Sequence, residues 1–288
     1  MTPFLTFSPR RDLREQIFNK WTQRGELTPD RDNKLIAKEI LLLRDEQAHM
    51  HSTNCFSEYQ LLDTMAKSSN NVMDLLLKVW EPAKISANRE RAELEKVAAA
   101  DGITEILPHD WRYYAEKVRN TKYNVDDNEI KPYFSLESIV AAVFYVTHQL
   151  FGLKFVPNSS IPVYHPDVQA YEVFEEVKDA NGNVTDKLLA IFLHDNFARP
   201  YKQSGAWMSD YRAQSIYNGE NIIPIVVNNN NFAKGNPTLL SFDDCRTLFH
   251  EFGHGLHGML SSCHYETLGG TNVLRDFVEL PRLLLPTH

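Results

Sequence analysis

The motif His250-Glu-Phe-Gly-His254 constrains this chain more than any other feature of its sequence. Residues four apart lie one turn apart on the same face of an α-helix, so a helix brings both imidazoles within reach of one Zn²⁺ at about 2.0–2.1 Å. Glu251 then lies beside the first ligand and can take a proton from a metal-bound water, which is the general-base role in this motif. The motif therefore predicts a helix that carries a catalytic zinc site.

The sequence around the motif also predicts a helix. Ser241-Phe-Asp-Asp244 fits a capping box, and apolar residues follow at helical spacing. These apolar residues are Leu248, Phe249, Phe252, Leu256 and Leu260. A chance HExxH is expected in roughly one chain in a hundred of this length, so a helical histidine pair without a metal is the alternative interpretation.

A catalytic zinc usually takes three protein ligands, which makes a third ligand the decisive question. Glu279 lies on the segment Arg275–Pro281, for which we expect a second helix. Asp276, one turn earlier, can orient a ligand imidazole as a hydrogen-bond acceptor. Taken alone, either carboxylate is more simply a surface group. His257 and His264 are weaker candidates, better explained as packing or exposed histidines.

Composition excludes several other classes. The net charge of −8 gives no general attraction for nucleic acid or anionic lipid. The longest apolar runs, such as Ile139–Val146, are well short of the roughly 20 residues that span a bilayer, and the first residues carry Arg and Asp where a signal peptide needs an apolar stretch. Three cysteines fit reduced thiols better than a disulfide framework. We expect a cytoplasmic protein with no nucleic-acid or membrane partner.

Hydrophobic periodicity predicts a mainly α protein with a small β-sheet, an α+β fold. We expect a helical region over residues 1–160, a β-rich segment over 161–235 that forms a wall of the active site, and metal-binding helices over 236–288. No internal repeat and no Gly/Ser linker separates them, so we expect one continuous body.

The helical region contains three clear patterns. One apolar helical face is made by Ile36, Ile40, Leu41 and Leu43. A second runs over 72–80, where Pro82 should kink or end the helix. A third helix should span 135–151, with Ser135 as its N-cap and Gly152 just past its end.

The β-rich segment begins with a hairpin candidate. Runs at 171–177 and 187–193 have strand composition and are joined by the turn signal 179–183. A further short strand is expected over 222–227, followed by a polar loop of four asparagines at 228–231.

With these features in place, the sequence resembles the thimet oligopeptidase family of zinc peptidases, and within it the bacterial peptidyl-dipeptidase (dipeptidyl carboxypeptidase) branch. The resemblance rests first on TLFHEFGHGLHGML at 247–260 and GGTNVLRDFVELP at 269–281. It continues in YHPDVQAYEVFE at 164–175, HDNFARPYKQSGAWMSDY at 194–211, DTMAKS at 63–68, VWEPAK at 79–84 and DWRYYAEKVRNTKY at 110–123. Essentially the whole chain is covered.

This resemblance implies a zincin-like catalytic core of a two-lobed helical peptidase. It implies one Zn²⁺ per chain, held by His250, His254 and Glu279, with Glu251 as catalytic base and short peptides as substrates. In peptidases of this shape an edge strand pairs with the extended substrate. We place part of that wall at Ser204–Met208, which makes Gly205, Ala206 and Trp207 substrate-binding candidates; a glycine turn with a buried Trp207 is the alternative.

Two departures from the family also carry expectations. Its members are much longer, so we expect a core incomplete at both ends, and the last residues, 282–288, leave the family pattern. The resemblance implies a further C-terminal region, absent from this chain, whose groups stabilise the oxyanion; one such donor is worth about 10²–10³ in rate. We therefore expect the chain alone to bind zinc and to be a poor or inactive peptidase. We also expect exposed apolar surface and a tendency to associate.

Three functions remain open at this point. The first is a zinc peptidase that releases C-terminal dipeptides from oligopeptides. The second is an endo-acting oligopeptidase with the same metal site. The third is a non-catalytic zinc- or peptide-binding protein. C-terminally amidated peptides separate the first two, because only a dipeptidase needs a free C-terminal carboxylate.

Overall fold

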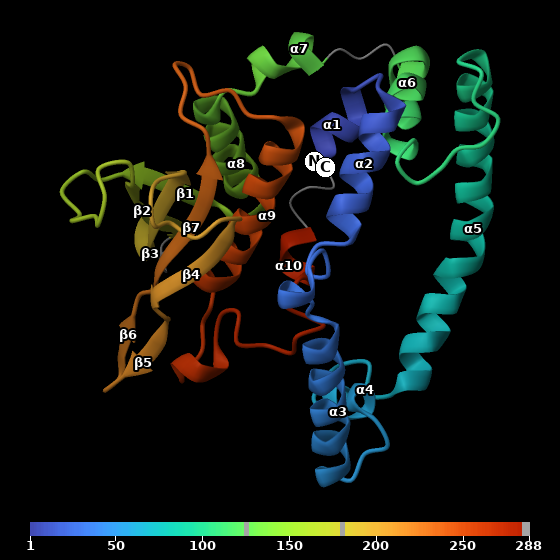
Figure 1. The fold of residues 1–288 in the computed structure, drawn as a ribbon. Coiled ribbons are helices and arrows are strands. Elements are labelled where there is room, and N and C mark those ends of the chain that lie inside the picture. The colour runs from blue at the N-terminus through green and yellow to red at the C-terminus, as the bar shows by residue number, and fades with distance from the viewer. Residues whose placement is uncertain (124–126, 179–181, 284–288) are drawn as a thin grey trace. The chain divides into compact units, whose positions relative to one another are not determined.

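A computed structural model describes residues 1–123, 127–178 and 182–283, and Figure 1 shows its helices and strands. Its contacts divide the chain into two compact units, Met1–Asp126 and Asp127–His288. The strands lie between Leu153 and Phe232, and the last long helix begins at Phe242. One strand therefore begins before the expected β-rich segment. Whether the whole chain forms one continuous body stays a prediction.

The regular elements described in the first unit are all helices. Its helices are α1 (Thr2–Phe7), α2 (Arg11–Thr22), η1 (Pro29–Arg31), α3 (Lys34–Met50), α4 (Phe56–Leu61), α5 (Ser69–Ala100) and α6 (Trp111–Tyr123). Leu94 and Ala98 of α5 pack with Tyr114 of α6 in a small core. Beside it, the buried carboxylate of Asp110 accepts a 2.8 Å hydrogen bond from Arg14.

Pro82 does not end the second expected helix, because α5 continues through it to Ala100. That part of the expectation was wrong. A proline removes one backbone donor from a helix, and the remaining hydrogen bonds of this 32-residue helix are enough to carry it through. Ser68 caps its start, where the side chain accepts a hydrogen bond from the backbone N–H of Asn71.

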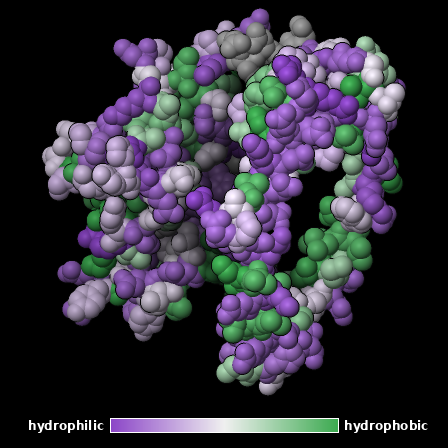
Figure 2. Space-filling view, in the orientation of Figure 1, coloured by the Kyte–Doolittle hydropathy of each residue, from purple (hydrophilic) through white to green (hydrophobic). Residues whose placement is uncertain are grey.

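Large apolar side chains are exposed on α3 and on the first half of α5. Figure 2 shows hydrophobic residues gathered over both helices. On α3 they include Leu35, Ile36, Leu41 and Leu42, and on α5 they include Leu75, Leu76, Val79 and Trp80. The expected helix around Ile36–Leu43 is confirmed, and so is the expected exposed apolar surface. Association through that surface stays a prediction.

The second unit combines a sheet with helices. Its helices are α7 (Asp127–Ile130), η2 (Lys131–Tyr133), α8 (Leu136–Phe151), α9 (Phe242–Met259), η3 (Glu266–Leu268) and α10 (Leu280–Leu283). Its strands are β1 (Leu153–Pro157), β2 (Gln169–Lys178), β3 (Val184–Phe197), β4 (Trp207–Arg212), β5 (Ser215–Tyr217), β6 (Glu220–Ile222) and β7 (Ile225–Phe232). The mixture confirms the α+β class, while the two-lobed zincin-like architecture stays a prediction.

Five strands form the main sheet in the order β1-β2-β3-β7-β4. All neighbours are antiparallel except β3 and β7, which are parallel. The expected hairpin is confirmed as the pair β2 and β3, although part of its turn, residues 179–181, lies outside the described residues. The order leaves β4 as an edge strand next to β7.

Helix α8 matches its expected bounds. The Ser135 side chain accepts a 3.1 Å hydrogen bond from the N–H of Ser138, and Gly152 adopts the left-handed conformation with φ of 69°. Such a helix end favours glycine, which has no Cβ to clash. Its buried face, which includes Val143, packs in one core with the sheet and with α9.

An aromatic cluster fixes α9 on the sheet. Phe252 of α9 is 1% exposed and lies 5.3 Å, centroid to centroid, from Phe192 of β3. Its ring also lies 5.5 Å from Phe155 of β1 and 6.0 Å from Phe144 of α8. Tilted and edge-on aromatic contacts at these distances add to the free energy of burying the rings. The cluster thereby places one face of α9 against β1, β3 and α8.

The expectation of a polar loop at 228–231 was wrong. These four asparagines belong to β7, and Asn228 and Asn230 are 0% and 1% exposed. Since β7 lies between β3 and β4, its backbone groups are paired on both sides, which outweighs the low strand propensity of asparagine. The side chains find partners as well: Asn230 donates to Asn196, and Asn231 donates to the carbonyl of Gly205.

Within the part of the chain that the structure describes, no helix is both long and apolar enough to cross a bilayer.

Candidate metal centre

Helix α9 carries the HExxH motif. Its expected capping box is confirmed: the Ser241 side chain accepts from the N–H of Asp244 at 3.1 Å, and the Asp244 carboxylate accepts from the N–H of Ser241 at 2.9 Å. Leu248, Phe252 and Leu256 are buried along one face of the helix. The cap sets where the helix begins and the buried face sets its rotation, so the histidines occupy a defined position.

His250, His254 and Glu279 come together in space. The ligand atoms of these three side chains all lie within 4.8 Å of one another. The His254 Nε2 atom lies 3.1 Å from Glu279 Oε2, and the His250 Nε2 atom lies 3.8 Å from the same oxygen. Among the residues that the structure describes, this is the group of His, Cys, Asp and Glu side chains arranged to hold a metal.

These distances fit a zinc ion. Three ligands placed about 2.0–2.2 Å from one ion in tetrahedral geometry lie about 3.3–3.5 Å from one another. The observed separations of 3.1 and 3.8 Å bracket that value. Two imidazoles and one carboxylate are also a donor set that zinc takes in catalytic sites, with a fourth position left open. The residues present therefore fit the metal that the motif predicts.

Glu251 lies at the edge of this group. Its Oε1 atom is 3.8 Å from His250 Nε2, and the residue is 8% exposed. As the neighbour of a ligand, with its carboxylate beside the space between the ligands, it is placed to exchange a proton with a molecule held there.

The segment that carries Glu279 is not the helix that we expected. Residues 275–279 form turns, and only Leu280–Leu283 are helical. Pro281 has no N–H to donate to the carbonyl of Phe277, and that carbonyl instead accepts from Leu280. Glu279 reaches the histidines from this turn, with half of its side chain exposed. Asp276 is exposed, and its expected role in orienting a ligand stays a prediction.

The expected substrate wall corresponds to β4 and the turn before it. Gly205 has φ of +92°, and its carbonyl accepts a 2.7 Å hydrogen bond from Asn231. Trp207 begins β4, is half-buried, and pairs with Asn229 of β7. The segment is therefore both a glycine turn and the start of an edge strand. The substrate-binding roles of Gly205, Ala206 and Trp207 stay predictions.

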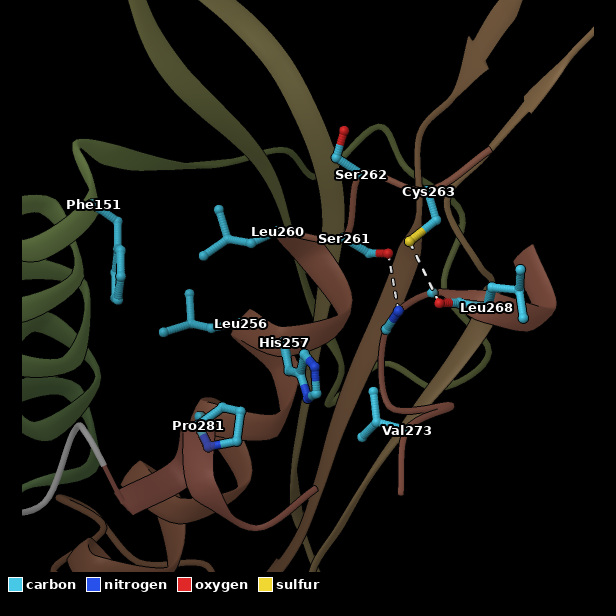
Figure 3. Close-up of a pocket in the computed structure, with 13 residues that line it drawn as sticks. Phe151, Leu256, His257, Leu260, Ser261, Ser262, Cys263, Leu268, Val273 and Pro281 are labelled. Carbon is cyan, nitrogen blue, oxygen red and sulfur yellow. Dashed lines mark hydrogen bonds between the residues drawn. The ribbon is translucent and has the colours of Figure 1, made fainter. Parts of the chain in front are cut away.

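His257 and His264 are not part of the three-ligand group. His257 lines a pocket of about 350 Å³ beside α9, with Phe151, Leu256, Val273 and Pro281 among its other lining residues (Figure 3). Burial lowers the pKa of His257, and nearby His254 lowers it further. His264 is exposed, and its ring packs edge-on against Tyr265. The weaker status that we gave both histidines agrees with this placement.

Sequence reasoning missed the polar residues under α9. His194 of β3 and Asn228 of β7 are register partners, and both are buried. The Asn228 side chain donates to the main-chain carbonyl of Glu251. Two sequence signals were available: the run of asparagines, which by itself is more typical of a loop, and the place of His194 at the start of the stretch 194–211 that carries the resemblance.

Comparisons with known proteins place the chain in a family. The family model "Peptidase family M3" matches residues 4–285. The dipeptidyl carboxypeptidase of Escherichia coli is 38% identical over 284 residues, which cover 97% of this chain and 40% of that protein. The oligopeptidase A of Haemophilus influenzae is 32% identical over 289 residues, which cover 97% of this chain and 41% of that protein. The chain thus spans about two-fifths of the length of the curated relatives that it matches. By the extent of the family match, the chain belongs to peptidase family M3.

Proposed function

We propose that this chain is the metal-binding part of a zinc-dependent peptidase that hydrolyses short peptides. The observation that carries the proposal is the convergence of His250, His254 and Glu279, whose ligand atoms lie within 4.8 Å of one another beside Glu251. Membership of a peptidase family supports hydrolysis of peptide bonds as the reaction. The known relatives support peptides as the substrate class, since their names are those of peptidases.

Each residue has a defined task in this proposal. His250, His254 and Glu279 hold the metal through two imidazole nitrogens and one carboxylate oxygen. Zinc bound there supplies a Lewis acid that polarises the scissile carbonyl and lowers the pKa of water towards about 7. The Glu251 carboxylate accepts the proton of the attacking water and passes it to the leaving amine.

The edge strand β4 is the proposed docking site for the substrate backbone. Among the described strands, β7 pairs with one side of β4, so the other side can offer backbone donors and acceptors to an extended peptide. Helix α9 packs against both strands, since a Cβ atom at Gly258 would meet Met208 of β4 and Val226 of β7. This proximity supports Trp207 and the preceding Gly205 and Ala206 as residues that line the bound peptide.

Release of C-terminal dipeptides is the mode of cleavage that we propose first, because the dipeptidyl carboxypeptidase of Escherichia coli shares 38% identity with this chain. Endo-acting cleavage is the second candidate, favoured by the 32% identity to an oligopeptidase A. A peptide and its C-terminally amidated form distinguish the two, because amidation should abolish only the release of dipeptides. A cytoplasmic location also stays a prediction.

The test is hydrolysis of a blocked tripeptide by the zinc-loaded chain beside Glu251→Gln, with Glu266→Gln as a control for an exposed glutamate outside the cluster. We expect a low rate that needs zinc and is lost in Glu251→Gln, while both variants keep their metal. The chain spans about two-fifths of the length of its relatives, so if it shows no rate above that of Glu251→Gln the comparison is repeated with the remaining regions supplied. Bound zinc without hydrolysis in that repeat would favour a non-catalytic binding protein. A rate that survives Glu251→Gln would contradict the assigned base.

A further inference from the structure

One sheet residue contacts the backbone of the metal-binding helix between its two histidine ligands. Asn228 of β7 is 0% exposed, and its Nδ2 atom donates to the main-chain carbonyl oxygen of Glu251. In an α-helix that carbonyl also accepts from the N–H of residue 255. A carbonyl oxygen has two lone pairs, so the Asn228 amide uses the one that the helix leaves free.

Gly255 makes this contact sterically feasible. A Cβ atom at that position would lie 2.6 Å from Asn228 Oδ1 and 3.5 Å from its Cγ, and the first distance is too short for any side chain. Glycine in a helix interior is destabilising relative to alanine, so a buried glycine here indicates that close approach is required. At Gly258 a Cβ would instead meet the flexible tip of Met208 at 2.6 Å.

The orientation of the Asn228 amide follows from its surroundings. The opposite orientation would place Oδ1 against the carbonyl oxygen of Glu251, two acceptors in contact. In the observed orientation, Oδ1 is buried with no hydrogen-bond partner among the described residues. A buried acceptor without a partner costs stability, and an apolar residue of the same shape would avoid that cost. The donated hydrogen bond is what an apolar residue could not supply.

We propose that Asn228 is a positioning residue for the metal centre, and that Gly255 allows it to act. Apolar packing sets which face of α9 lies against the sheet, but it is non-directional and defines the position of a single peptide group less finely than a hydrogen bond does. The hydrogen bond to Glu251 fixes one peptide group of the helix to β7, and with it the neighbouring ligand His250 and the ligand His254 one turn on. The proposal rests on the proposed function, because that function assigns the metal to these ligands.

The experiment compares two buried asparagines on the same face of β7. Zinc dissociation constants are measured by competition with a chelator for wild type, Asn228→Ala and Asn230→Ala. Asn230 donates to Asn196 of β3 and not to α9, so its loss removes a buried amide without releasing the helix. We expect about tenfold weaker zinc binding for Asn228→Ala, as for other residues that orient metal ligands, and less than twofold for Asn230→Ala. Equal effects in the two variants would overturn the proposal.

Two further variants guard against simple misfolding. Asn228→Leu keeps the volume and removes the donor, and it should weaken zinc binding as much as Asn228→Ala does. Gly255→Ala should weaken it similarly in the wild-type background and cause no further loss in the Asn228→Ala background, because the atom that it strikes is gone. Additive losses would contradict the close contact. The visible spectrum of the Co²⁺-loaded chain should change in Asn228→Leu and stay unchanged in Asn230→Ala.

A failure of the proposed function would give a different experimental result from a failure of the positioning role of Asn228. If wild type binds no zinc, the metal site itself is wrong. The contact between Asn228 and Gly255 is then tested by the urea midpoints of Asn228→Ala, Gly255→Ala and the variant that carries both substitutions. Non-additive midpoints would support the contact, and additive midpoints would contradict it.

Discussion

Replacing Asp195 by asparagine should destabilise the second unit strongly, because this carboxylate is buried among cations. Asp195 lies near the end of β3 and is 0% exposed. It accepts two hydrogen bonds from Arg199, at 2.6 and 2.7 Å, and one from Lys202 at 2.9 Å. Tyr164 donates a further hydrogen bond at 2.9 Å. The Lys202 side chain is itself only 4% exposed.

The magnitude follows from these contacts. Burial raises the pKa of Asp195, but the hydrogen bonds from Arg199, Lys202 and Tyr164 outweigh it and lower the pKa from 3.8 to about 2. That difference corresponds to about 2 kcal/mol of stability, present above pH ~4 and lost as the pH falls through about 2. Asp195→Asn at pH 7 also leaves the Lys202 ammonium buried without its counter-charge, which typically costs about 3–5 kcal/mol.

Urea unfolding at pH 7 measures the loss, with Asp167→Asn as the matched control. Asp167 pairs with Lys234 at 2.6 Å, but that lysine side chain is 59% exposed, so the control should lose less than about 1 kcal/mol. A cost for Asp195→Asn no greater than that of the control would contradict the predicted loss. It would show that the Lys202 ammonium finds water or another partner when its carboxylate is removed.

Two further predictions concern elements that support the metal helix. Burial lowers the pKa of His194 from 6.5 to about 4. Between these two pH values the unfolded chain therefore binds one more proton than the folded chain does. Stability should therefore fall by up to about 3 kcal/mol as the pH drops from about 6.5 to about 4, and His194→Leu should flatten this part of the profile of urea midpoint against pH. An unchanged profile in that variant would contradict the assignment. Ser241→Ala removes the cap of α9 and should cost about 1 kcal/mol in thermal unfolding; a melting temperature equal to that of wild type would show that the cap is dispensable.

The elements that the sequence predicted correctly are those with local causes. Helix α8 begins at a serine cap and ends at Gly152, and α9 begins at the Ser241 capping box. These signals depend on neighbours within four residues, so they can be recognised without the rest of the fold. The spacing of His250 and His254 is equally local, which is why the sequence alone identifies them as a pair.

The error at the four asparagines came from contacts between distant residues, and the error around Glu279 came in part from a nearby proline. Asn228 belongs to a central strand because β3 and β4 pair with β7 on either side and Glu251 accepts its amide hydrogen, and none of these partners is near it in sequence. The composition around Glu279 favours a helix, but Pro281 interrupts the backbone hydrogen bonds there. The turn that brings Glu279 to the histidines depends on the tertiary fold, which local composition does not encode.

Metal analysis of the purified chain beside Glu279→Ala tests whether His250, His254 and Glu279 hold a metal ion together. Glu279 is the one ligand of the three that lies outside α9, and its Oε2 atom is 3.1 Å from the His254 Nε2 atom. We expect zinc close to one ion per chain in wild type and loss of most of that zinc in Glu279→Ala. Equal zinc content in the two proteins, or none in wild type, would contradict it.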